Sequence, residues 1–355
     1  MRLWFDIVTP KQLLFFRPVV EALRAGGQEV LATSRKYREV ERLASMLGLG
    51  LSFVGSRGGK EPREQFELSL QRMEQLLPMV VGFSPDVSVS VASADCARVS
   101  FALRVRHVAV NDSPHSLVAG KLSLPLSYHV MTPWIIPFSA WSVFGVSRGQ
   151  VSRYRALDPA AWLKRRARQE PSPPEAGKGE KRARILVRLE ESYAPYLAGS
   201  DESWSERVLL RLARDFKGHE LVALCRYEDQ LASVRKKFGS EYSVPDDAFD
   251  GAGMIERSDV FVGMGGTMTT EAALLGVPAV SAFQGAELYT EKYLLSKRLL
   301  LKARSVDGVS RCVRASLDPG YRESYSRRGR ALLEWMEDPS EKVLEYLKAL
   351  GPGAR

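Results

Sequence analysis

Residues 259–283, DVFVGMGGTMTTEAALLGVPAVSAF, contain a complete strand–turn–helix–strand unit. The apolar run 259–263 predicts a buried parallel strand, which the pair Gly265-Gly266 ends. Residues 267–275 predict a helix that stops at Gly276, and residues 277–283 predict a second buried strand. Because crossovers of this kind are right-handed in nearly all cases, this stretch predicts part of a parallel sheet.

The turn of this unit is suited to an anion. Gly265 and Gly266 have no Cβ, so a ligand can approach their backbone closely. The helix start adds free N–H groups and the positive end of the helix dipole. Thr267, the expected N-cap, and Thr269 add hydroxyls, and Glu271 is placed to accept hydrogen bonds from a ribose diol. A tight turn before a capped helix, with no ligand, is the structural alternative.

At these residues the chain resembles a known superfamily. Gly-Gly followed by Glu-Ala-x-x-x-Gly-x-Pro is similar to the nucleotide-sugar signature of GT-B glycosyltransferases and of non-hydrolysing UDP-N-acetylglucosamine 2-epimerases. Residues 268–278, MTTEAALLGVP, fit the core M-x-T-E-A-x-x-L-G-x-P of a prokaryotic family in that superfamily, domain of unknown function number 354. The resemblance implies that Gly265, Gly266 and Thr267 lie near a diphosphate and Glu271 near a ribose.

Composition sets the broad class. The chain has 355 residues, 45% of them apolar and 26% charged, which suits a soluble globular protein of two domains. A net charge of +9 suits anionic partners. The sequence contains no module of basic and aromatic residues of the kind that binds nucleic acid, so a nucleic-acid partner is not expected. Cys96, Cys225 and Cys312 are isolated, which favours a reducing cytoplasm and no metal site. The start MRLWFDIVTP resembles a strand, so no signal peptide is expected.

Strands and helices alternate through both halves of the chain, which predicts an α/β protein with doubly wound parallel sheets. Strands are predicted at 2–8, 29–34, 51–54, 86–92, 107–111, 128–132, 142–146, 183–188, 220–226, 259–263, 277–283 and 299–302. The resemblance covers 1–160 and 183–340. It implies a GT-B architecture of two Rossmann-like domains facing a cleft, with C-terminal helices that cross back to the first domain.

The expected domains follow from this reading. They are an acceptor-side domain at 1–165, a linker-like segment rich in Pro, Gly and charge at 166–182, a nucleotide-sugar domain at 183–335 and a C-terminal helix at 336–355. Ligands of such sheets bind at the carboxyl ends of the strands, so the loops at those ends hold the candidate residues.

The first such loop and the helix after it resemble the opening of the same family. In GT-B enzymes this loop lines the acceptor side, which makes Lys11 and Gln12 the candidate contacts here. Phe15 and Phe16 are expected in the core, since aromatic residues at helical spacing usually pack there.

Asp112-Ser113-Pro114-His115 follows a predicted strand. The related family has an acidic–x–x–His pattern at this point, which this sequence keeps. The functional interpretation is a general base for an acceptor hydroxyl, with Asp112 preferred and His115 as its orienting partner. The structural interpretation is that Asp112 or Ser113 caps a helix that has Pro114 at its first position.

Residues 122–147 contain no charged side chain. Pro125, Pro133 and Pro137 argue against a membrane helix and favour two buried strands joined by a turn. A lesser alternative is an exposed patch that meets a membrane or a lipid-linked acceptor, made of Trp134, Ile135, Ile136, Phe138 and Trp141. The basic stretch 148–168 is predicted to be a solvated face, with contact to anionic headgroups as the alternative.

Arg188 ends a predicted strand of the second half. GT-B enzymes often use a cation here, and a guanidinium can hold diphosphate oxygens in pairs. Glu190 is expected either to contact an acceptor or to pair with Arg188. Gln284 and Glu287, after another strand, are candidates for contacts with sugar hydroxyls.

These features favour a cytoplasmic, metal-independent GT-B glycosyltransferase that needs no cofactor and takes a nucleoside-diphosphate sugar, with a UDP-sugar as the expected donor. The acceptor stays open, with a lipid-linked acceptor and peripheral membrane contact among the alternatives, and so does a homodimer. A UDP-N-acetylglucosamine 2-epimerase is the second enzyme hypothesis. His219 weakens it, because this histidine precedes a strand and is expected to face away from the ligand edge. A non-catalytic nucleotide-binding or scaffold protein is the third hypothesis.

Overall fold

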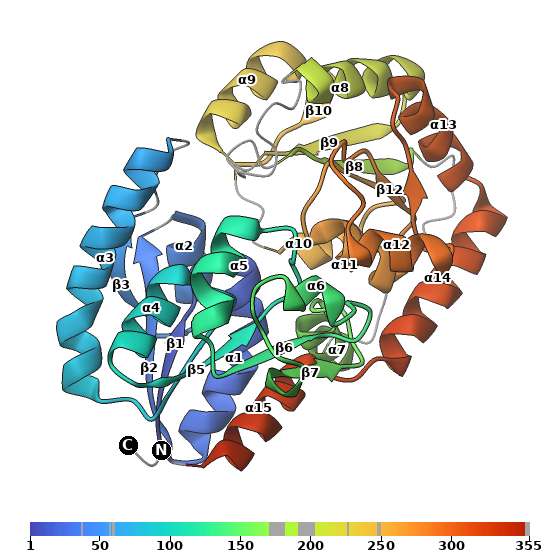
Figure 1. Cartoon of the computed structure of the whole chain (residues 1–355). Helices are drawn as coiled ribbons and strands as arrows, with labels where there is room; N and C mark the ends of the chain where they lie inside the picture. The colour runs from blue at the N-terminus through green and yellow to red at the C-terminus, as the bar shows by residue number, and fades with distance from the viewer. Residues whose placement is uncertain are drawn as a thin grey trace. The chain divides into compact units, whose positions relative to one another are not determined.

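The computed structural model describes residues 1–36, 38–56, 58, 61–169, 182–190, 203–225, 227–246 and 250–351. The chain divides into two compact units, which we treat separately. The first unit comprises residues 1–162 and 337–355, and the second comprises residues 163–336. Each unit is built around one parallel sheet with flanking helices (Figure 1). The predicted α/β class with two doubly wound parallel sheets is therefore confirmed.

The sheet of the first unit has seven parallel strands in the order β3-β2-β1-β4-β5-β6-β7. The strands are β1 (Arg2–Asp6), β2 (Glu29–Lys36), β3 (Ser52–Ser56), β4 (Val87–Ser90), β5 (Arg106–Val110), β6 (His129–Pro133) and β7 (Val151–Tyr154). The helices are α1 (Pro10–Ala25), α2 (Arg38–Met46), α3 (Pro62–Phe83), α4 (Ala94–Ala102), α5 (Leu117–Ser123), α6 (Ser139–Ser142) and α15 (Pro339–Leu350), with 3₁₀ turns η1 (Leu124–Leu126) and η2 (Arg148–Gln150). Helix α7 (Ala160–Gln169) continues into the second unit.

The sheet of the second unit has six strands in the order β10-β9-β8-β11-β12-β13. The strands are β8 (Arg184–Arg188), β9 (Glu220–Leu224), β10 (Tyr242–Ser243), β11 (Val260–Gly263), β12 (Ala279–Ser281) and β13 (Leu301–Lys302). The helices are α8 (Ser203–Asp215), α9 (Glu228–Phe238), α10 (Gly251–Glu256), α11 (Met268–Leu275), α12 (Tyr289–Ser296), α13 (Val306–Ser316) and α14 (Pro319–Trp335).

Both sheets have a switch point in their strand order. The order reverses between β1 and β4 in the first sheet, and between β8 and β11 in the second. At such a switch point the loops that leave the two neighbouring strands diverge to opposite faces and open a crevice at the carboxyl ends. The loops that follow β1, β8 and β11 carry most of the predicted site residues.

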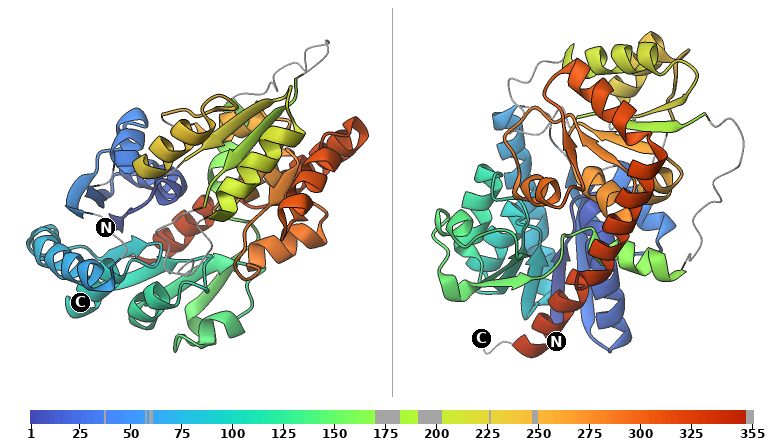
Figure 2. Two further views of the ribbon diagram at one scale, coloured as in Figure 1. Left: turned by 90° about the horizontal axis from the view of Figure 1, so that it is seen from above. Right: turned by 90° about the vertical axis from the view of Figure 1, so that its right-hand side faces the viewer.

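The C-terminal helix returns to the first unit, as the fold class implied. Helix α15 packs beside α1 (Figure 2). Tyr346 of α15 stacks on His129 with ring centroids 4.3 Å apart, and Arg106 Nη2 donates to the Gly351 carbonyl at 2.9 Å. The chain therefore begins and ends its described part in the same unit.

The predicted strand at 142–146 is wrong. Short helix α6 ends at Ser142 and a turn at 143–145 follows it, and the strand that pairs with β6 on its outer side is β7, further along the chain. Trp141 and Phe144, three residues apart, are 0% and 4% exposed, with ring centroids 6.4 Å apart. Residues at that spacing share one face of a helical turn, and a short apolar run such as 142–146 does not by itself distinguish a strand from a helix. Strand β10 and helix α13 were also not predicted.

The first residues of the linker predicted at 166–182 are helical, because α7 continues to Gln169. Residues 170–181 lie outside the described part of the chain. No helix among the described residues is long and apolar enough to cross a bilayer.

Buried His107 is expected to make the free energy of unfolding of the first unit fall at acid pH. It is 1% exposed and lies between the Ser90 and Ser127 hydroxyls, each 2.9 Å from a ring nitrogen. Burial lowers the pKa of His107 from 6.5 to about 4. The unfolded chain therefore binds this proton first as the pH falls. The expected loss is on the order of 3 kcal/mol of stability between pH 6.5 and pH 4.

Urea unfolding at several pH values would check this for the parent and for His107→Gln. The difference in unfolding free energy between the two proteins should shrink as the pH falls from 7 to 4. The comparison is made against the variant because other groups also titrate in this range. A difference that stays constant with pH would contradict the assignment.

Candidate functional site

Lys11 joins three segments at the carboxyl edge of the first sheet. It lies in the first turn of α1, just after β1, and its Nζ is 2.6 Å from Asp112 Oδ2 and 2.8 Å from Asp158 Oδ2. The Asp158 side chain is 1% exposed, and its Oδ1 accepts from the Tyr154 hydroxyl at 2.7 Å. The structure therefore brings the predicted residues Lys11 and Asp112 together and adds two that were not predicted, Tyr154 and Asp158.

The pKa values of the two carboxylates of this cluster are shifted in opposite directions. Burial alone raises the pKa of Asp112, but the Lys11 charge and the hydrogen bonds from Lys11 and Ser113 outweigh it and hold this pKa below its usual value. Burial and the Asp112 charge raise the pKa of Asp158 to about 6. Asp112 thus carries a firmly held negative charge, which makes it a weak proton acceptor in this arrangement.

His115 lies in the loop that carries Asp112. Burial lowers its pKa below 6.5, although the Asp112 charge acts in the opposite direction. A neutral imidazole at pH 7 is the form that accepts a proton. Of the two predicted catalytic residues, His115 therefore has the better protonation state for a general base, whereas the sequence favoured Asp112.

The structure corrects the helix cap predicted in this loop. Helix α5 begins at Leu117 with Ser116 as its N-cap, so Asp112 and Ser113 do not cap it. The Asn111 side chain instead accepts from the Ser113 N–H at 2.8 Å, which makes a local turn. Asp112 and His115 therefore lie on an irregular loop rather than on one face of a first helical turn.

Gln12 is buried rather than presented to a ligand. It is 6% exposed, and its Oε1 accepts from the Val8 N–H at 2.7 Å. This bond shapes the loop between β1 and α1. Phe15 and Phe16 are 1% and 0% exposed, which confirms their core position.

A second charged network lies beneath the same edge and was not predicted. Arg72 of α3 is 1% exposed and binds Asp6 at the end of β1, at 2.5 and 3.1 Å. Its Nη1 also donates to Asp95 at 2.9 Å, and Asp95 accepts from Arg35 Nη2 at 2.8 Å. Ser93 and Thr33 donate to Asp6. The network fixes the ends of β1 and β2 to helices α3 and α4.

In the second unit, the predicted turn has the geometry of an anion site. Gly265 and Gly266 have φ values of +115° and +84°, which residues with a Cβ rarely adopt. The N–H groups of Thr270 and Glu271 donate to the Thr267 carbonyl at 2.9 and 3.0 Å. The N–H groups just before them are therefore the ones that α11 cannot satisfy internally. Thr267 is the N-cap residue of α11, as predicted, but its hydroxyl makes no cap hydrogen bond.

Thr269 adds an unsatisfied polar atom to this turn. It is 5% exposed, and its Oγ1 has no hydrogen-bond partner in the described part of the structure. A Cβ at Gly263 would lie 2.1 Å from this oxygen, so glycine is needed at the end of β11. Glu271 is 6% exposed, in the same helix turn. A buried hydroxyl without a partner is costly unless a ligand or water meets it.

Arg188 lies next to this turn through its backbone. It pairs with Gly263 in the sheet, and its carbonyl accepts from the Met264 N–H at 3.0 Å. Its Nη1 donates to the Leu224 carbonyl of β9 at 3.2 Å. One end of the guanidinium is thus bonded to the backbone of β9.

The side chain of Glu190, which was predicted to contact an acceptor or Arg188, binds Ser205. Burial raises its pKa, and Ser205 donates a hydrogen bond to its side chain. Of the two loop candidates after β12, Gln284 donates to the Ala282 carbonyl at 3.0 Å, and Glu287 lies 3.6 Å from Arg304. Both are exposed at the same edge of the sheet.

The structure also corrects the predicted apolar patch. Ile136 and Trp141 are both 0% exposed and belong to the core.

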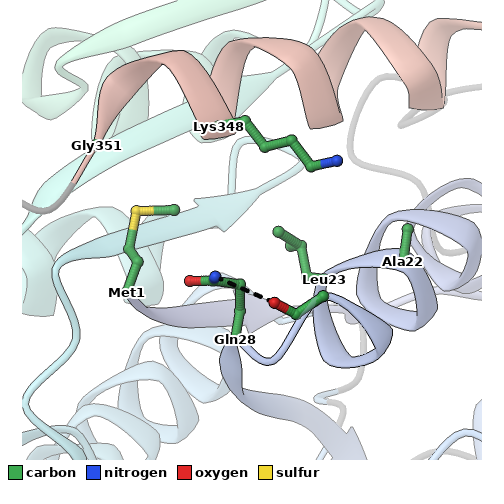
Figure 3. Close-up of a pocket in the computed structure, with 7 residues that line it drawn as sticks. Met1, Ala22, Leu23, Gln28, Lys348 and Gly351 are labelled. Atoms are coloured by element: carbon green, nitrogen blue, oxygen red, sulfur yellow. Dashed lines mark hydrogen bonds between the residues drawn. The ribbon is translucent and has the colours of Figure 1, made fainter.

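A hollow of about 250 Å³ in the first unit lies at the amino edge of the sheet (Figure 3). Met1, Leu23, Gln28 and Lys348 line it with other residues. Ligands of parallel α/β sheets bind at the opposite edge, so this hollow is not the candidate site.

His219 lies where the sequence predicted. Its Nδ1 accepts from the Ala183 N–H at 3.1 Å, just before β8 and β9 begin. This is the amino edge of the second sheet, away from the Gly265-Gly266 turn.

Solved structures similar to this chain are enzymes that act on sugars. S. aureus MnaA, in a structure with UDP, has a TM-score of 0.77 at 14% identity over 98% of this chain and 96% of that chain. The UDP-GlcNAc 2-epimerase from Methanocaldococcus jannaschii has a TM-score of 0.65 at 12% identity, over 98% and 100%. Spinosyn Forosaminyltransferase SpnP has a TM-score of 0.64 at 17% identity, over 99% of both chains. These likenesses show the GT-B fold.

Sequence relatives cover nearly the whole chain. An uncharacterized protein of Methanocaldococcus jannaschii is 24% identical over 356 residues, which span 97% of this chain and 98% of that protein. The profile of a family described as "Protein of unknown function (DUF354)" matches residues 1–347. The chain has the GT-B fold and belongs to the DUF354 family.

Proposed function

We propose that this protein is a glycosyltransferase that moves a sugar from a nucleoside-diphosphate sugar, with UDP as the expected nucleotide, to an acceptor hydroxyl. The observation that carries the proposal is the Gly265-Gly266 turn at the start of α11, with the unpartnered Thr269 hydroxyl beside it. Exposed N–H groups and a helix dipole suit a diphosphate. A structure of a similar glycosyltransferase, Spinosyn Rhamnosyltransferase SpnG, contains thymidine diphosphate.

The first unit supplies the acid–base group in this proposal. His115 accepts the proton of the acceptor hydroxyl, whose oxygen forms a bond to the sugar anomeric carbon. The bond from that carbon to the diphosphate breaks, and the nucleoside diphosphate leaves with its electron pair. Asp112 stabilises the imidazolium that forms, while Lys11 and Asp158 hold Asp112 in place. The N–H groups of the turn and Arg188 neutralise the leaving diphosphate without a metal ion.

Nucleotide binding is the first test. Calorimetry with UDP, dTDP, GDP and ADP would compare the parent with Thr269→Val and Arg188→Ala. Each variant loses a hydrogen bond to the charged diphosphate, so Thr269→Val and Arg188→Ala are each expected to weaken binding by about 1.5–3 kcal/mol. EDTA should leave binding and turnover unchanged.

Two matched controls separate binding from folding. Thr132 of β6 is also buried with an unpartnered hydroxyl, so Thr132→Val makes the same chemical change away from the turn. Arg184 lies at the amino end of the strand that Arg188 ends, and it pairs with Glu220 at 3.3 Å. Thr132→Val and Arg184→Ala should bind nucleotides like the parent. Equal weakening in the controls would contradict the placement of the site at the turn. A parent that binds no nucleotide would contradict the proposed transferase and favour the scaffold hypothesis.

A 2-epimerase remains the second candidate because a putative UDP-N-acetylglucosamine 2-epimerase from Listeria monocytogenes has a TM-score of 0.75, above the 0.64 of the forosaminyltransferase. The position of His219 at the amino edge argues against an epimerase that uses this histidine. Incubation with UDP-N-acetylglucosamine alone separates the two functions. An epimerase would form the 2-epimer without any acceptor, which proton NMR detects, whereas a transferase would leave the sugar configuration unchanged.

A further inference from the structure

Helix α3 carries more apolar surface than the core of its unit covers. Its inner face, with Leu76 and Val80, packs against Trp4 and Val54. A second row points to solvent, with Phe66 56%, Leu70 44%, Leu77 46% and Val81 56% exposed. At 3.6 residues per turn, these four side chains fall within an arc of about 60°. We call this row the α3 seam. Figure 1 shows α3 at one side of the first unit.

The α3 seam is symmetric about its own centre. Phe66 and Val81 lie equally far from the midpoint between Met73 and Glu74, and so do Leu70 and Leu77. Two antiparallel copies of α3 related by a twofold axis at that midpoint would therefore place Phe66 on Val81 and Leu70 on Leu77, twice each. A twofold interface requires this kind of self-complementary surface.

The charged residues of α3 lie between Arg63 and Glu74. Residues 61–67 contain three acids and one base, and Arg63 is 2.8 Å from Glu67. Past Glu74 the helix has no charged residue. Antiparallel pairing thus brings the acidic start of each α3 toward the uncharged end of its partner, away from the partner's own acidic start, and sets the helix dipoles antiparallel.

We propose that the occupant of the α3 seam is a second copy of this chain, in a homodimer with antiparallel α3 helices. A 22-residue helix is about 33 Å long and roughly 10 Å wide. The pairing therefore covers on the order of 330 Å² of helix surface per copy, about 660 Å² in total, which is the size of a small and reversible interface.

Mass in solution tests the dimer. Light scattering and sedimentation equilibrium of the parent should give twice the chain mass. Leu70→Glu and Leu77→Glu should give monomers, since each places two charges in the paired seam. Both side chains are exposed, so both variants should keep the parent circular dichroism. Leu210→Glu on α8, where the leucine is 59% exposed, is the matched control and should stay dimeric.

Cysteine cross-linking tests the register. In a background with Cys225→Ser and Cys312→Ser, Glu74→Cys lies beside the twofold axis and should form a disulfide-linked dimer on mild oxidation. Glu64→Cys should not, because its two copies would be about 28 Å apart along the helix, far beyond the reach of a disulfide.

Three outcomes would overturn the inference. The parent would be a monomer at 100 μM, or the Glu variants would remain dimers, or Glu64→Cys would cross-link as well as Glu74→Cys. A monomeric parent that sediments with phosphatidylglycerol vesicles, and loses that binding in Leu70→Glu, would assign the seam to a lipid surface instead. None of these readouts depends on the proposed activity.

Discussion

Replacing Arg72 by methionine is expected to lower the free energy of unfolding by about 3–5 kcal/mol, the usual result of leaving buried charges without their partner. Arg72 is 1% exposed and neutralises Asp6 and Asp95, which are 0% and 1% exposed. Methionine fills much of the space but supplies no charge. Urea unfolding at pH 7 would measure the loss. Arg63→Met is the control on the same helix, because the Arg63 side chain is 91% exposed and should contribute little.

The same variant should also show a changed pH dependence. Burial alone raises the pKa of Asp6, but Arg72 and the hydrogen bonds outweigh it and hold this pKa below 3.8 in the parent. Asp6 therefore stabilises the parent above pH 4, and that contribution is lost as the pH falls through the lowered pKa. Without Arg72, burial raises the pKa of Asp6. The deficit of Arg72→Met should then shrink between pH 7 and pH 5. A deficit that grows on acidification would contradict this account.

Replacing His115 by glutamine is expected to reduce turnover about 10²–10⁴-fold, the range for loss of a general base, while nucleotide binding stays near that of the parent. This follows from the proposed function, in which neutral His115 accepts the acceptor proton. Asp112→Asn should reduce turnover by a similar factor, because the imidazolium loses its anionic partner. The measurement is release of nucleoside diphosphate, once an acceptor is identified among sugar, peptide and lipid-linked hydroxyl compounds.

The pH–rate profile separates the roles of the two residues. The pKa of His115 lies below 6.5, so turnover should fall on the acid side of that value as the imidazole takes up a proton. The residual turnover of His115→Gln should lack this acid limb, and that of Asp112→Asn should keep it at lower pH. If His115→Gln has parental turnover and Asp112→Asn has none, Asp112 is the base, as the sequence alone suggested.

Local sequence patterns were sufficient to predict the parallel sheets of this protein and the turn at Gly265-Gly266. Continuous apolar runs such as 259–263 predict buried parallel strands because both faces of such sheets are covered. The Gly265-Gly266 turn was predictable because a positive φ at two successive positions favours glycine, and the structure has both. The alternation of strands and helices then fixed the edge at which ligands bind.

Local patterns failed where an apolar run is short or where another hydrogen bond replaces an expected one. The run 142–146 is too short to distinguish a buried strand from a helical turn, so it was assigned to the wrong element. The helix cap at Asp112 was wrong because Asn111 makes the turn first and the carboxylate of Asp112 binds Lys11 instead.

By itself, the sequence determined two parallel sheets, their ligand edges and the glycine turn of the second unit, since each depends on residues close together in the chain. Only the tertiary structure decided which charges meet. Lys11 and Asp158 are far apart in sequence and 2.8 Å apart in space, and Arg72 joins Asp6 to Asp95 in the core. Such pairs leave no local pattern, because a lone charged residue in a sequence looks the same whether water or a distant partner solvates it. Their protonation states, and hence the preference for His115 over Asp112, follow from burial and distance, which only the folded chain supplies.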